Sequence, residues 1–161
     1  MDTLEITVTS LADSGAGSLR EALQFANSAP SNAQDMNIIL NMESLPAGGV
    51  IELQSALPAI NSGALVTIKG PEGGVTLSGY GLEAQSNVEL QNITLPELLV
   101  NGAASVSGSG VVFTGSGAVI DMVTYADLSG LSASATHAGA YVYVEDYATE
   151  MQLVALGCRW T

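Results

Sequence analysis

Apolar and polar residues alternate in short runs along most of this chain, a pattern typical of β-strands that are buried on one face. The first run is L-E-I-T-V-T, in which Leu4, Ile6 and Val8 share one face, and it predicts a strand over residues 4–9. Comparable runs predict strands over 37–40, 50–53, 65–69, 75–78, 88–90, 92–95, 98–101, 105–107, 111–114, 118–122, 140–147 and 151–156. Short turns rich in Gly, Ser and Asn separate them, including one at 115–117, and Pro96 is expected to end a strand. Strands this short favour the three-sided coils of a solenoid over the hairpins of a sandwich.

One stretch has a helical pattern instead. Gly15 and Gly17 permit a tight turn, Ser18 can cap a helix, and Glu21 follows three residues later as in a capping box. Apolar residues then recur at helical spacing, which predicts a helix over 18–28. A helix of about 10 residues is marginal in water on its own, so we expect it to cover the open end of the solenoid.

The residues expected to build this cap are Asp13, Gly15, Gly17, Ser18, Leu19, Arg20, Glu21 and Leu23. We expect Arg20 to pair with Asp13 or with Glu21, and so to hold the cap to the turn before it. A ligand-binding role for Arg20 is the alternative.

The segment Gly17-Ser18-Leu19-Arg20-Glu21-Ala22 resembles the C-S-L-R-E-A signature near the start of bacterial secreted β-helix proteins. I-E-L-Q-S-A-L-P-A-I at 51–60 and V-T-I-K-G-P at 66–71 are also similar to the first part of right-handed parallel β-helices in secreted and surface proteins. Gly17 replaces the signature's cysteine. The resemblance implies an all-β, right-handed parallel β-helix with one N-terminal capping α-helix, located outside the cell or on a bacterial cell surface.

The length of 161 residues suggests a single domain over 1–161. Within it, residues 1–36 are expected to form the first strand and the helical cap, 37–122 the coils, and 123–161 C-terminal coils or docking strands. Cys158 is the single cysteine, so there is no disulfide framework. We expect a buried thiol, with pairing between molecules as the alternative.

The charge balance excludes several partners. The chain has 3 Lys and Arg residues against 16 Asp and Glu residues, a net charge of −13. Nucleic-acid binding needs a basic surface, and so does adhesion to an anionic membrane. No run reaches the roughly 18 apolar residues that a membrane span needs. We therefore expect self-association or another surface protein as the partner.

No catalytic residues are expected. His137 is the sole histidine and lies in a small-residue stretch with no nucleophile motif. Glu145 and Asp146 form the one adjacent acidic pair, but neighbouring strand residues point to opposite faces and cannot share a substrate. A glycan-active β-helix, a polysaccharide lyase or hydrolase, is the alternative function.

Five acidic residues in the C-terminal part of the chain could bind calcium or could form a solvated acidic face. The candidate ligands are Asp121, Asp127, Glu145, Asp146 and Glu150. Oxygen-rich loops can bind Ca²⁺, but no EF-hand pattern is present. We expect no cofactor, with Ca²⁺ as the alternative.

The C-terminal residues carry no evident polar cap, and an uncapped end pairs readily with other strands. The assembly candidates there are Tyr141, Tyr143, Leu153, Leu156 and Trp160. The sequence therefore predicts a non-enzymatic extracellular structural or adhesive protein, with self-assembly into a surface or filament subunit.

Overall fold

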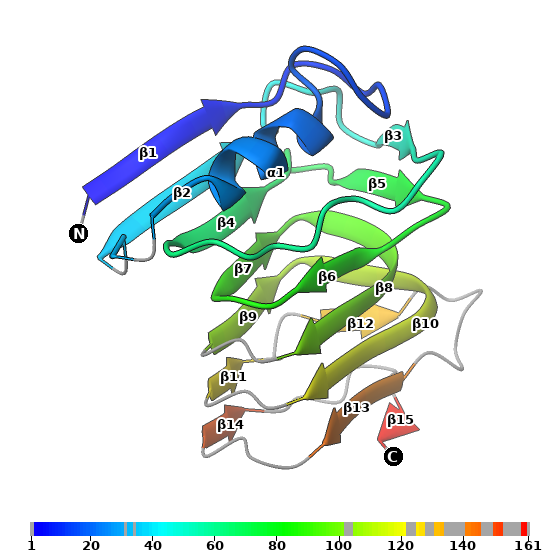
Figure 1. The fold of residues 1–161 in the computed structure, drawn as a ribbon. Helices are drawn as coiled ribbons and strands as arrows, with labels where there is room; N and C mark the ends of the chain where they lie inside the picture. Colours follow the sequence, from blue (N-terminus) through cyan, green and yellow to red (C-terminus); the bar gives the residue numbers. More distant parts are fainter. Residues whose placement is uncertain are drawn as a thin grey trace.

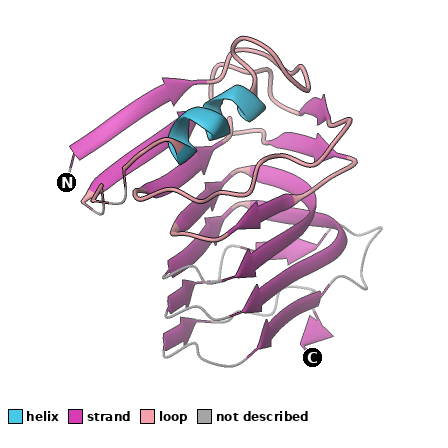
Figure 2. Ribbon diagram, in the orientation of Figure 1, coloured by secondary structure: helices cyan, strands magenta, loops and turns pink. Residues whose placement is uncertain are grey.

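The computed structural model describes residues 2–30, 32–33, 35–101, 105–121, 125–127, 131–133, 141–145, 150–152 and 159–160. Over these residues the chain forms two sheets of mostly parallel strands and one helix (Figures 1 and 2). The strands stack along one axis, and the helix α1 (Leu19–Asn27) lies beside the first strands (Figure 1).

The first sheet has the order β1-β2-β4-β7-β9-β11-β14. Its strands are β1 (Asp2–Thr7), β2 (Met36–Asn41), β4 (Leu65–Lys69), β7 (Val88–Gln91), β9 (Ser105–Ser109), β11 (Tyr125–Asp127) and β14 (Glu150–Gln152). The parallel register aligns apolar residues across neighbouring strands: Leu4 pairs with Ile38, which pairs with Val66 and so with Val88.

The second sheet has the order β15-β13-β10-β8-β5-β3, with β6 paired to β8 and β12 paired to β10. Its strands are β3 (Gly49–Glu52), β5 (Val75–Ser78), β6 (Leu82–Ala84), β8 (Ile93–Asn101), β10 (Val111–Asp121), β12 (Leu131–Ala133), β13 (Tyr141–Glu145) and β15 (Arg159–Trp160). Strands of this sheet mostly alternate along the chain with strands of the first, so the connections cross repeatedly between the two sheets.

The hydrophobic core takes side chains from both sheets and from α1. Its fully buried large residues include Leu19, Leu23, Ile38, Leu40, Met42, Ile51, Ile60, Ile68, Leu77, Leu90, Ile93 and Phe113. Burial alternates along the strands, as in the buried-intermediate-buried pattern of β5 and β7. Period-2 patterning of the sequence therefore produces the apolar rows between the layers.

The prediction of an all-β chain folded as a single right-handed β-helix of three-sided coils is wrong. The described strands belong to two mostly parallel sheets with one helix, and their order is not that of one strand per coil, because β6 and β12 lie off the path of the second sheet. The cause lies in two long strands. The turns expected at Pro96 and at 115–117 do not end a strand, so β8 pairs with both β5 and β6, and β10 with both β12 and β13. A register shift between Phe113 and Gly117 absorbs the glycine-rich segment as an irregularity within β10.

The helix precedes every strand of the second sheet along the chain. The first sheet contains both β1 and β2 before the second sheet begins with β3, and α1 comes between β1 and β2 in the chain. Its apolar face is buried through Leu19, Ala22, Leu23 and Ala26, as predicted. The helix therefore covers part of the core beside the first strands, and its role as a cap over the end of the stack stays a prediction.

Candidate functional site

The cap forms at the N-terminus of α1 largely as the sequence indicates. Ser18 is the N-cap, and its Oγ accepts a hydrogen bond from the Glu21 N–H at 3.2 Å. The Glu21 carboxylate accepts the Gly17 N–H at 2.7 Å, so it reaches one residue beyond the position that a capping box predicts. The Ser18 N–H instead donates to the Gly15 carbonyl. The capping chemistry is thus present, with a shifted partner for Glu21.

Gly17 is required by two features of this turn. Its φ is +77°, which L side chains rarely adopt, and its carbonyl accepts the N–H groups of Thr9 and Ser10. A Cβ at this position would overlap Thr9 Oγ1. Any residue with a side chain would therefore be both strained and in steric conflict at position 17.

We expect Gly17→Ala to lower the free energy of unfolding by about 1–3 kcal/mol, because it combines left-handed backbone strain with a steric clash. Gly15→Ala is the matched control: Gly15 has φ +96° but no neighbour within 4 Å of an added Cβ, so it carries only the strain. Urea unfolding followed by circular dichroism measures both. In a Thr9→Ala background the cost at Gly17 should fall to that at Gly15, and equal costs in the wild-type background would contradict the clash.

Arg20 joins the helix to two loops, and its predicted pairing with Asp13 is confirmed. Its Nη2 lies 2.9 Å from Asp13 Oδ1, and its Nε donates to the Asp13 carbonyl. The same guanidinium donates to the carbonyls of Ser55 and Ala56 at 2.9 and 2.7 Å. Asp13 Oδ1 also accepts the Gln54 N–H at 2.9 Å. These contacts hold the pKa of Asp13 below its usual value. The hydrogen bond from Gln54 has the largest effect, and the one from Arg20 has the next largest.

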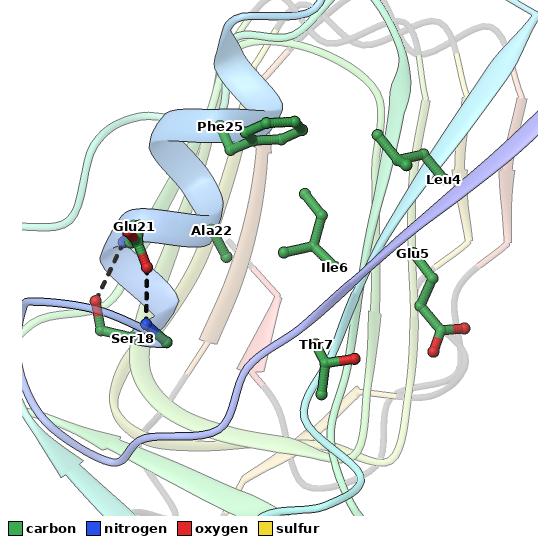
Figure 3. A pocket seen from close by; sticks show the side chains of 9 residues that line it. Leu4, Glu5, Ile6, Thr7, Ser18, Glu21, Ala22 and Phe25 are labelled. Carbon is green, nitrogen blue, oxygen red and sulfur yellow. Dashed lines mark hydrogen bonds between the residues drawn. The ribbon is translucent and has the colours of Figure 1, made fainter.

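A groove of about 390 Å³ opens between β1 and the first turns of α1 (Figure 3). It is lined by Leu4, Glu5, Ile6, Thr7, Gly17, Ser18, Glu21, Ala22 and Phe25. Leu4 and Ile6 extend from β1 toward the helix, which presents Ala22 and Phe25 to them (Figure 3). Phe25 is 56% exposed and Leu4 is 38% exposed, so a substantial apolar surface meets water here.

Sequence reasoning missed this groove, although one signal for it was present. Phe25 lies off the buried stripe of α1, on the exposed side of a helix whose other apolar residues are buried. A large aromatic residue outside the core stripe indicates a contact surface, but its neighbours on β1 could not be known before the strand and the helix were placed together.

A second, smaller depression of about 100 Å³ lies over β6 and β8. It is lined by Ala56, Leu57, Tyr80, Gly81, Leu82, Glu83, Glu97 and Leu99. Its two carboxylates come from different strands, and the pairing of β6 with β8 sets Glu83 opposite Leu99. Sequence reasoning did not single out this acidic pair, because residues 83 and 97 are brought together only by strand pairing.

The calcium candidates occupy scattered positions. The register of β10 and β13 sets Asp121 opposite Glu145, whereas Asp127 ends β11 and Glu150 begins β14. Asp146 lies outside the described residues. Within the described residues, no group of three His, Cys, Asp or Glu could hold a metal ion. Calcium binding by the C-terminal acidic residues stays the untested alternative to a solvated acidic face.

Three of the five assembly candidates lie in the last described strands of the second sheet. Tyr141 and Tyr143 lie in β13, and Trp160 lies in β15, where it pairs with Val142. Leu153 and Leu156 fall outside the described residues, as do His137 and Cys158. Assembly through this end of the chain is therefore a prediction that these strands neither support nor contradict.

Comparison with known proteins gives no match: no family model, no curated protein and no solved structure is similar to this chain. In the described part of the chain, no helix is long and apolar enough to cross a membrane.

Proposed function

We propose that this chain is a non-enzymatic structural or adhesive module of the bacterial cell surface or extracellular space, which binds another surface protein or a further copy of itself. The observation that carries the proposal is the groove between β1 and α1. It is the larger of the two depressions described above, it exposes apolar side chains, and it runs along a strand at the edge of a sheet. Such surfaces suit protein segments rather than small polar substrates.

Two features of the sequence support the same proposal. The segment 17–22 resembles the cap signature of bacterial secreted proteins, and the net charge of −13 keeps an apolar-rich chain in solution and opposes non-specific clumping. Any association of this chain should therefore depend on a specific surface.

A glycan-active enzyme is the alternative function, and one observation favours it. Glu83 and Glu97 line the same depression as Tyr80, and glycosidases use a pair of carboxylates beside the scissile bond. The depression is about 100 Å³, well below the roughly 300–1,000 Å³ of ordinary ligand pockets. Its size favours the adhesive proposal.

The test is an assay of the purified chain on pectin and alginate, with reducing ends measured for hydrolysis and unsaturated products for lyase action. We expect no turnover above a buffer control. Product formation that disappears in Glu83→Gln or Glu97→Gln would replace the adhesive proposal by the enzymatic one. The same holds for turnover lost on changing Asp121, Asp127, Glu145 or Asp146 to the corresponding amide.

A further inference from the structure

The first strand has one unpaired edge. Among the described strands, β1 pairs with β2 alone. The Asp2 N–H donates to the carbonyl of Asp35, just before β2, at 3.2 Å. The Val8 N–H donates to the carbonyl of Asn41, the last residue of β2, at 2.8 Å. In a parallel ladder the residues that bond to one neighbour alternate with those that face the other side. The backbone groups of the odd-numbered residues, from Thr3 to Thr7, therefore point away from β2.

The groove lies on this open side of β1. Five of its lining residues belong to the turn at Gly17 and to α1, four belong to β1, and none belongs to β2. A segment entering the groove can thus meet two kinds of group at once. Its backbone can bond to the free edge of β1, while its side chains contact Leu4, Ile6 and Phe25 (Figure 3).

The charges around the groove select the segment. Glu5 and Glu21 line it, and none of its lining residues is basic. The described part of the chain has two ion pairs, Arg20 with Asp13 and Lys69 with Glu43. None of these four residues lines the groove. Glu21 Oε2 already accepts the Gly17 N–H, and Glu5, which extends away from Leu4 and Ile6 in Figure 3, accepts the side-chain amide of Asn41. Neither carboxylate forms an ion pair within the described residues, so Lys or Arg on a docked strand would supply a cationic partner.

We propose that this groove binds an extended basic segment of another protein, in which apolar residues alternate with Lys or Arg, as an added strand on the edge of β1. The inference rests on the proposed adhesive function and names its partner. A second copy of this chain is a poor occupant, because it has 3 basic residues in all and would bring a further charge of −13.

The ligand side is tested with a fluorescein-labelled peptide in which valine and lysine alternate, added to the full chain at low salt and followed by fluorescence polarisation. We expect saturable binding, weakened at least about tenfold when glutamate replaces lysine, and weakened by added salt. Two further peptides carry N-methyl groups on either the valines or the lysines. Because alternate N–H groups of a strand point to opposite edges, one methylated peptide should bind like the parent and the other should not bind.

The protein side is tested with a matched pair of helix variants. Phe25→Ser should weaken binding at least about tenfold, whereas Gln24→Ser, on an exposed neighbour that does not line the groove, should not. Circular dichroism confirms that both variants fold. Amide hydrogen exchange by NMR should show new protection at Thr3, Glu5 and Thr7 when the parent peptide binds, because these N–H groups face the open edge.

The inference would be overturned by equal binding of both methylated peptides, by equal binding of the two helix variants, or by no saturable binding of the parent peptide. Self-association of the chain that is lost in Phe25→Ser would assign the groove to a second copy and would also overturn it. None of these results involves turnover of a polysaccharide, so they leave the non-enzymatic proposal to be judged by its own assay.

Discussion

Replacing Leu23 by aspartate is expected to lower the free energy of unfolding by more than about 4 kcal/mol. Leu23 is fully buried in the core, on the face of α1 that packs toward the sheets. Truncation of a buried leucine to alanine already costs about 2–5 kcal/mol, and a carboxylate at such a site adds the cost of a charge without a partner. Because domains are stable by about 5–15 kcal/mol, the variant should be largely or wholly unfolded near the cap.

Urea unfolding monitored by circular dichroism measures the effect. Leu23→Ala should lie between the aspartate variant and the wild type, and Gln24→Asp, one residue along on the exposed side of the helix, should change stability by about 0.5 kcal/mol or less. Comparing Leu23→Asp with Gln24→Asp separates the effect of burying a charge from the effect of merely adding a charge to α1. Wild-type-like melting of Leu23→Asp would contradict the role of α1 as the cover of the core.

The helix could be predicted from the sequence because its signals are local. The cap at Ser18, the glutamate three residues later and the apolar spacing all lie within a dozen residues, and the observed α1 agrees with them. The strands over 65–69 and 75–78 were likewise predicted to the residue, since their patterns are short, alternating and bounded by turn residues.

The arrangement of the strands could not be predicted in the same way. Pro96 and the glycines at 115 and 117 are turn signals locally, yet pairing with neighbouring strands keeps β8 and β10 continuous through them. β6 was missed because Leu82-Glu83-Ala84 is too short to show a period, and its pairing with Leu98–Val100 defines it. These long-range pairings change the number of sheets, and so they overturned the predicted solenoid.

The groove, like the arrangement of the strands, could not be predicted because it depends on contacts between distant segments of the chain. It depends on the free edge of β1, on the placement of α1 beside it and on the exposure of Phe25, and only the last of these leaves a trace in the sequence. The predicted cap residues, by contrast, were brought together because hydrogen bonds within a single turn fix them. Local chemistry was therefore predictable here, while the surface that carries the functional proposal required the tertiary arrangement.

Removing the Arg20 guanidinium is expected to have the other large effect. Arg20→Met breaks four hydrogen bonds at once: two to Asp13 and one each to the carbonyls of Ser55 and Ala56. Hydrogen bonds to charged groups contribute about 1.5–3 kcal/mol each, and the Arg20 side chain is only 15% exposed, so we expect a loss of at least about 2 kcal/mol. Lys69→Met is the matched control, because the Lys69–Glu43 pair is 38% and 48% exposed and surface pairs contribute about 0–1 kcal/mol.

The pH dependence of stability provides an independent check of this contact. Hydrogen bonds from Gln54 and Arg20 hold the folded-state pKa of Asp13 below its usual value of 3.8. The unfolded chain therefore binds this proton more readily than the folded chain. The contribution of the Asp13 carboxylate is thus fully present above the unfolded pKa and is lost as the pH falls through the lowered folded pKa. Urea unfolding between about pH 6 and pH 2 should show a smaller acid loss of stability in Asp13→Asn and in Arg20→Met than in the wild type. Identical acid profiles for all three proteins would show that the contact with Asp13 does not stabilise the fold.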